Sequence, residues 1–262
     1  MNGIMDSKVA AASSANINVS ENSADVLAIG AHPDDVEISA GGSVAKLVRE
    51  GKRVVIVDCT RGEQSTRGMV SERMAEACEA AEILGVHKRE VLELPDGFVG
   101  THPDHVLSVI KMFRKYRPRI VLMPPPFERH PDHEAVHRLC RSAYFLSGLA
   151  KIETMDGDEL QKPFRPMFMF CYIQAYHHEA DFFVDVSETY QTKLDSIRAF
   201  RSQVHIPDAT ARPEPQTFIS SPAFMDLIEN RSRLFGSMIG CMHAEGFLKV
   251  EPLRIESFSH WL

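Results

Sequence analysis

The sequence predicts an α/β fold with a mostly parallel sheet, helices on both faces and a small β/α extension at its C-terminal end. From Asp25 onward, short apolar runs alternate with amphipathic stretches, which is typical of parallel strands joined by helices. At 262 residues, 44% of them hydrophobic, the chain is long enough for one large domain over residues 25–262. Residues 1–24, rich in small and polar side chains, predict a disordered tail and no signal peptide.

The expected elements follow one another in strand and helix order. Ser43 is placed to cap the first helix and Gly51 to end it. In the first half, strands are expected at 26–30, 53–57, 91–94 and 119–123, and helices at 43–50, 71–85 and 106–116. After about Gly148 the pattern changes, and strands are expected at 166–175 and 182–186 and helices at 187–203 and 222–239.

Composition excludes several kinds of partner. The formal net charge of −7 comes without a run of like charges, which argues against nucleic acid and against an anionic membrane surface. No apolar stretch approaches the roughly 20 residues that cross a bilayer. Five cysteines, an odd number without Cys-x-x-Cys spacing, are expected to be reduced core residues of a soluble, cytoplasmic protein.

Two segments carry most of the chemical information. The first, Ala31-His32-Pro33-Asp34-Asp35-Val36-Glu37, follows the first expected strand, and the second, Arg129-His130-Pro131-Asp132-His133, follows the fourth. Ligands of open α/β sheets bind at the carboxyl ends of the strands. Both segments should therefore meet at one edge of the sheet.

Their residues suit a catalytic metal site. His32 and Asp35 are three residues apart and can face one point if the turn is roughly helical, and His133 could supply a third ligand. Two histidines and one carboxylate leave open positions for water, as catalytic sites do. Alternatively, His32 before proline could be an ordinary loop residue.

Neighbouring side chains can supply acid and base chemistry. The metal would lower the pKa of its water to roughly 7. Asp34 must point away from Asp35, so it lies beside the metal without binding it and is the natural base. His130 is free to act as general acid or oxyanion partner, and Asp132 could orient it. Asp132 could also cap a helix beginning near Glu134, whereas Asp34 and Asp35 lie too far from Ser43 to cap the first helix.

Other motifs receive structural or weaker interpretations. The segment 101–105 spells His-Pro-Asp-His a second time, but we expect it at the amino edge of the sheet, with Thr101 as a helix cap and no chemistry. His177 and His178 could be exposed turn residues or part of a site. Three arginines follow the second strand, and one could bind an anionic substrate bidentately: Arg61, Arg67 and Arg73.

With Gly41-Gly42, the two motifs resemble those of the LmbE-like (PIG-L-type) zinc-dependent de-N-acetylases over about residues 25–250. The resemblance is closest to the subgroup of bacillithiol biosynthesis, which deacetylates N-acetylglucosaminyl-malate. The cues for the subgroup are Val36-Glu37, Arg73, residues 198–203, Phe235-Gly236 and residues 244–247.

The resemblance implies a Rossmann-like fold, a homo-oligomer (trimer or hexamer) and one Zn²⁺ per chain, with Fe²⁺ as an alternative. It implies that the ion is held by His32, Asp35 and His133, that Asp34 is the base, and that His130 and Asp132 form an acid pair. It also implies substrate contacts by Arg73 and His178. Two positions depart from relatives that often have tyrosine there, namely Phe224 and His243.

Three functions remain open at this stage. The first is deacetylation of N-acetylglucosaminyl-malate, and the second keeps this chemistry but acts on chitobiose or another N-acetyl amino sugar. The third is a non-enzymatic Rossmann-like binding module. The first turn lacks Gly-x-Gly-x-x-Gly and carries Asp34 and Asp35 where a pyrophosphate would sit, which argues against the module.

Overall fold

The computed structural model describes residues 23–205, 215–254 and 257. Nearly all of the predicted tail, residues 1–22, lies outside this part. Ala24 is already buried, and its N–H donates to the carbonyl of Tyr116. None of the helices described is both long and apolar enough to cross a bilayer.

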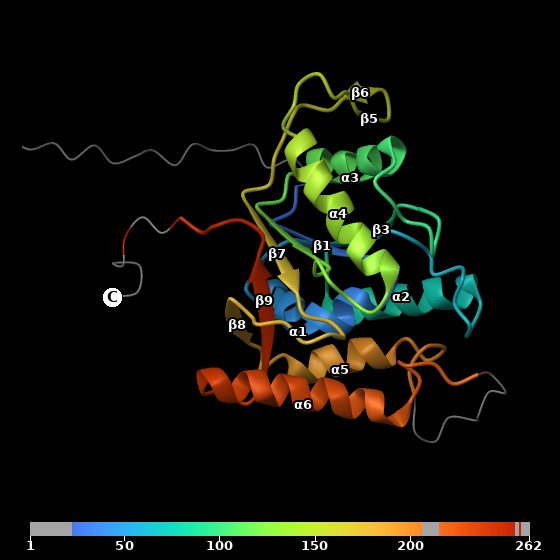
Figure 1. Cartoon of the computed structure of the whole chain (residues 1–262), viewed down its shortest axis with the longest axis vertical. Coiled ribbons are helices and arrows are strands. Elements are labelled where there is room, and N and C mark those ends of the chain that lie inside the picture. The colour runs from blue at the N-terminus through green and yellow to red at the C-terminus, as the bar shows by residue number, and fades with distance from the viewer. Residues whose placement is uncertain (1–22, 206–214, 255–256, 258–262) are drawn as a thin grey trace, which may run out of the picture.

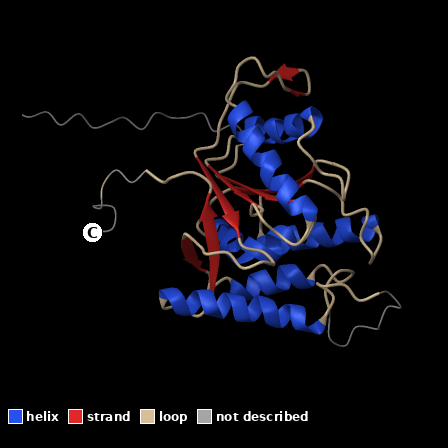
Figure 2. Cartoon of the chain, in the orientation of Figure 1, coloured by secondary structure: helices blue, strands red, loops and turns tan. Residues whose placement is uncertain are grey.

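A seven-stranded, mostly parallel sheet organises the molecule (Figure 2). Five strands are parallel, and the last two run antiparallel to their neighbours in the order β7, β9, β8. Across the sheet the strands are β3 (Lys88–Val91), β2 (Val54–Asp58), β1 (Val26–Gly30), β4 (Ile120–Met123), β7 (Phe168–Tyr172), β9 (Ala244–Lys249) and β8 (Phe182–Asp185). A separate hairpin pairs β5 (Met155–Asp156) with β6 (Glu159–Leu160). The predicted fold class is confirmed.

Helices cover both faces, as Figure 1 shows. They are α1 (Asp35–Arg49), α2 (Val70–Leu84), α3 (Pro103–Tyr116), α4 (Pro131–Leu146), α5 (Tyr190–Arg198) and α6 (Pro222–Ile239). Successive side chains of a strand point to opposite faces. Leu27 of β1 therefore packs in the cluster that includes residues of α3 and α4, whereas Val26 packs with α1. Helices α5 and α6 form a further layer beyond α1 (Figure 1).

The first helix differs most from the prediction. It begins at Asp35 and not at Ser43, which is buried in the middle of α1. The low helix propensity of the Gly41-Gly42 pair hid its first two turns. Those glycines are needed for packing, because a Cβ on Gly42 would lie 2.8 Å from the side chain of Val186.

Smaller differences concern the other elements. Strand β3 precedes its predicted position by three residues, and α5 is shorter than the predicted helix 187–203. Strand β9 was not predicted as a strand at all. The remaining predicted strands agree with the structure to within a few residues, and α6 spans the predicted range 222–239.

A buried ion pair fastens the C-terminal extension to the first helix. The Glu245 carboxylate, on β9, accepts hydrogen bonds from the backbone N–H groups of Gly42 and Ser43 in α1, at 3.0 and 2.8 Å. It also pairs with the ammonium group of Lys193, on α5, which is 2% exposed. Burial lowers the pKa of Lys193, and Glu245 partly opposes this effect. One carboxylate thus joins α1, α5 and β9.

We expect Lys193→Met to lower the free energy of unfolding by about 3 to 5 kcal/mol, because it leaves the Glu245 charge buried and unpaired. Urea denaturation measures this change. The control is Lys151→Met, at an exposed position. Equal stability of the two variants would contradict the role given to the pair.

Candidate active site

The turn from β1 into α1 positions three of the predicted residues. One oxygen of Asp35, Oδ2, accepts the backbone N–H groups of Ala31 and His32, both at 2.9 Å. This closes the turn and brings the His32 and Asp35 side chains to one point, as expected from their spacing. Asp34 sits at the N-cap with φ of 123°, a conformation that residues other than glycine rarely adopt.

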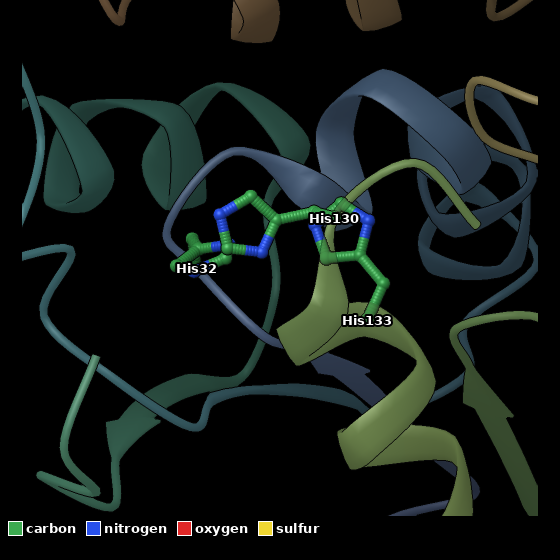
Figure 3. Close-up of side chains that lie close together, drawn as sticks. All are labelled: His32, His130 and His133. Carbon is green, nitrogen blue, oxygen red and sulfur yellow. The ribbon is translucent and has the colours of Figure 1, made fainter. Parts of the chain in front are cut away.

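Helix α4 brings two more histidines to this turn. Figure 3 shows the side chains of His32, His130 and His133 gathered together. Their ring centroids are separated by 4.6 Å for His32 and His130, 5.4 Å for His32 and His133, and 5.2 Å for the third pair. The three histidines can each offer one nitrogen within 4.8 Å of the others. The two predicted motifs therefore meet at the carboxyl edge of the sheet.

The predicted ligand set fits a divalent metal ion. Zinc ligands about 2.1 Å from the ion in tetrahedral geometry lie about 3.4 Å apart. Asp35 Oδ1 lies 3.2 Å from His133 Nε2, and Asp35 Oδ2 lies 3.6 Å from His32 Nδ1. Because imidazole and carboxylate are ordinary zinc ligands, both the donors and their spacing are suitable. His130 is an additional candidate, since its ring is equally near.

Negative charge is concentrated around His32. Burial alone would lower the pKa of His32, but the nearby carboxylates of Asp132, Asp35 and Asp96 raise it well above its usual value. The pKa of Asp35 is well below its usual value, since His133 and His32 outweigh the effect of burial. Carboxylates this close together in a buried site favour a cation among them.

Arg73 lies against the predicted base. Its Nη2 is 2.9 Å from Asp34 Oδ2, and its Nε and Nη2 donate to the carbonyl of Pro33 at 3.0 and 2.8 Å. Burial raises the pKa of Asp34 to about 7, although Arg73 opposes this rise. A base with a pKa near the working pH is well suited to proton transfer.

The beginning of α4 differs from both interpretations of Asp132. His130 is the N-cap residue, and its Nδ1 accepts the backbone N–H of Asp132 at 3.2 Å. The Asp132 carboxylate faces elsewhere: it accepts the N–H of Gly97 at 2.7 Å and lies 3.4 Å from His32 Nε2. Asp132 therefore touches His130 through its backbone and His32 through its side chain. Burial lowers the pKa of His130.

The connection between β3 and α3 was placed at the wrong edge of the sheet. It follows the carboxyl end of β3, and its residue Asp96 reaches His32 Nε2 at 3.0 Å. Sequence reasoning missed Asp96, although its place after a parallel strand was a signal. The second His-Pro-Asp-His motif forms the end of this connection and the first turn of α3, with His102 and not Thr101 as the N-cap. His102 is exposed, whereas His105 contacts the backbone of Gly100.

A cavity of about 270 Å³ opens above the cluster. Polar residues of the cluster and Arg73 are part of its lining. The lining also has an apolar part, with side chains from α1, α6 and the segment before α6, namely Ile38, Phe218, Ile219, Phe224, Leu227 and Ile228. Phe224, singled out in the sequence, is thus part of the apolar lining.

Two other predicted positions lie outside the cavity lining. His178 is half-buried, and its Nε2 is 2.8 Å from the carbonyl of Phe127. His243 is buried against Tyr190, with parallel rings 3.8 Å apart, and its Nδ1 lies 3.3 Å from the hydroxyl of Ser232. His243 therefore has a packing role, which the sequence did not suggest.

The fold and this cluster define an α/β protein with a histidine and aspartate site suited to a metal ion at the carboxyl edge of its sheet. Comparison with known proteins gives the family. The family model described as PIG-L, GlcNAc-PI de-N-acetylase, matches residues 27–144. Diacetylchitobiose deacetylase of Thermococcus kodakarensis is 31% identical over 247 residues, which are 90% of this chain and 87% of that protein.

Solved structures agree. A conserved protein of Thermus thermophilus has a TM-score of 0.78 and 31% identity, covering 90% of this chain and 98% of that one. N,N'-diacetylchitobiose deacetylase of Pyrococcus horikoshii, complexed with an inhibitor, has a TM-score of 0.75 and 27% identity, covering 94% and 91%. The chain belongs to the PIG-L family of deacetylases.

If His133 is a ligand, His133→Ala should lower the bound divalent metal from about one ion per chain to a small fraction of it, because only two predicted ligands remain. Elemental analysis of the metal-loaded protein measures this. His102→Ala, on an exposed histidine, is the control and should keep its metal. Full occupancy in His133→Ala would move the site elsewhere.

Proposed function

We propose that this protein is a zinc-dependent hydrolase that removes the N-acetyl group from a small N-acetyl amino sugar, with N,N'-diacetylchitobiose as the favoured substrate. The main support is the placement of Asp34, a buried carboxylate with a pKa near 7, beside the cluster of His32, Asp35 and His133. Membership of a deacetylase family supports the same reaction.

His32, Asp35 and His133 would hold the ion, which would supply Lewis acidity and an activated water when bound. The Asp34 carboxylate takes a proton from the attacking water as the water oxygen adds to the acetyl carbonyl carbon. The carbon–nitrogen bond then breaks as Asp34 passes that proton to the nitrogen, and the free amine and acetate are released. His130 lies beside the cluster, where its ring can donate to the carbonyl oxygen or to the departing amine.

Arg73 and the cavity wall favour a neutral sugar over the malate conjugate. Malate would need cationic partners, but the guanidinium group of Arg73 is engaged by the Pro33 carbonyl and the Asp34 carboxylate. That of Arg129, the other arginine of the cavity lining, lies 4.6 Å from the centroid of the Phe218 ring. The apolar part of the lining suits the faces of pyranose rings. Two similar proteins are named as diacetylchitobiose deacetylases. Of the two substrates considered from the sequence, chitobiose therefore has the stronger support.

Acetate release from a panel of substrates tests this choice. We expect diacetylchitobiose to be hydrolysed with a higher kcat/KM than N-acetylglucosaminyl-malate, with N-acetylglucosamine as the single-ring reference. Preference for the malate conjugate would restore the bacillithiol assignment. Absence of acetate release from every N-acetyl sugar, in protein loaded with zinc or with iron(II), would favour a binding module.

Replacing the base should separate catalysis from metal binding. We expect Asp34→Asn to lower kcat about 10²- to 10⁴-fold, the usual contribution of a general base, while metal content stays unchanged. Asparagine is chosen because it tolerates a positive φ better than alanine does. Acetate release and elemental analysis are measured on the same sample. A rate near that of the wild type would exclude Asp34 as the base, and metal loss would make it a ligand.

A further inference from the structure

Asp96 is a buried carboxylate for which the reaction above has no use. It lies on the connection between β3 and α3, is 5% exposed and lines the cavity. Both of its oxygens are engaged: Oδ1 lies 3.0 Å from His32 Nε2, and Oδ2 accepts the backbone N–H of Gln64 at 2.7 Å. Its own N–H donates to Glu63 at 3.2 Å. The carboxylate is therefore held from two sides and aimed at His32.

The two ring nitrogens of His32 face different partners. Nε2 faces Asp96, whereas Nδ1 lies on the side of Asp35, 3.6 Å from its Oδ2. Asp35 in turn reaches His133 Nε2 at 3.2 Å. The side of His32 that carries Nδ1 therefore faces the predicted ligands, and the side that carries Nε2 faces the β3–α3 connection.

We propose that Asp96 is a positioning residue for the metal site: it accepts the Nε2–H of His32 and so presents Nδ1 of that ring to the ion. A histidine ligand commonly donates its second ring N–H to a carboxylate, which fixes the tautomer and the ring orientation and strengthens the ligand. This inference rests on the metal site of the proposed function. It extends that site to the β3–α3 connection, which lies outside the segments 31–37 and 129–133.

Asp132 is the competing acceptor, but its geometry is weaker. Its Oδ2 lies 3.4 Å from His32 Nε2, and the same oxygen accepts the N–H of Gly97 at 2.7 Å. Hydrogen bonds between nitrogen and oxygen are usually about 2.7 to 3.2 Å long. Asp96 at 3.0 Å is within that range and Asp132 is not, so Asp96 is the acceptor. The bond between Gly97 and Asp132 instead ties the loop that carries Asp96 to α4.

A second alternative makes Asp96 a ligand. His32, Asp96 and Asp132 also form a group whose potential ligand atoms lie within 4.8 Å of one another. In that arrangement the ion would lie on Nε2 of His32, away from His133. The two arrangements thus predict that different nitrogens of His32 bind the ion, and an experiment can distinguish them.

The experiment measures the affinity of the metal-free protein for Zn²⁺ by competition with a chelator. We expect Asp96→Ala to weaken binding about 10- to 100-fold, the usual effect of losing such a partner. Asp96→Asn should lie between this variant and the wild type, because its amide has one acceptor for two facing donors, His32 Nε2–H and Gln64 N–H. Circular dichroism checks folding, and Asp96→Asn replaces Asp96→Ala if the latter does not fold.

Glu63→Ala is the matched control. It removes the bond from Glu63 to the N–H of Asp96 but leaves the Asp96 carboxylate in place, so it disturbs the same loop without removing the acceptor. Its affinity for Zn²⁺ should stay close to that of the wild type. Zn²⁺ binding by Asp96→Ala as tight as by the wild type would overturn the proposal, and so would equal losses in Asp96→Ala and Glu63→Ala.

A crystal structure of the zinc-loaded wild type decides between positioning and ligation. Nδ1 of His32 facing the ion is the expected result, and Nε2 facing an ion bound by Asp96 would overturn the proposal. Neither measurement uses substrate. If no N-acetyl sugar is hydrolysed but Asp96→Ala still weakens Zn²⁺ binding, the proposed function fails while the role of Asp96 stands.

Discussion

The candidate site depends on one oxygen atom, Oδ2 of Asp35, and the two backbone N–H groups that it accepts. By closing the turn after β1 on itself, it fixes where the His32 ring stands and leaves the other Asp35 oxygen facing His133. The same closure leaves Asp34 in a left-handed conformation, which is strained for aspartate. Arg73 supports this conformation, because its guanidinium binds the Pro33 carbonyl and the Asp34 carboxylate together.

Charge explains why so many elements contribute to the site. Buried carboxylates are costly without partners, and those of the cluster receive them from several different segments. Asp35 accepts a backbone N–H of the β1–α1 turn and lies against His133. Asp34 pairs with Arg73 of α2, and Asp96 accepts a backbone N–H of the segment after β2. The carboxyl edge of a parallel sheet is where such segments converge. Metal binding at this point would therefore be coupled to the arrangement of the whole edge.

Sequence reasoning succeeded where position along a strand decided the outcome. His32 and His133 could be brought together because each follows a recognisable buried strand. It failed where packing between segments distant in the sequence decided the structure. The start of α1 was hidden because Gly41-Gly42 is locally unfavourable in a helix and is retained by its fit against Val186. Asp96 was missed because β3 has no fully buried residue, and the connection after it was assigned to the opposite edge.

Arg73 shows why residue type alone could not give the substrate. Its place after the second strand suggested an anion partner, and it has one, but that partner is Asp34 of the same chain. A guanidinium group that already holds a backbone carbonyl and a carboxylate has few donors left. For the proposed sugar substrate, selectivity would then depend more on the apolar residues of the lining from α1 and α6. Because Glu245 and Lys193 fasten the C-terminal extension to α1, the extension that completes the sheet also supports the surface against which a sugar would bind.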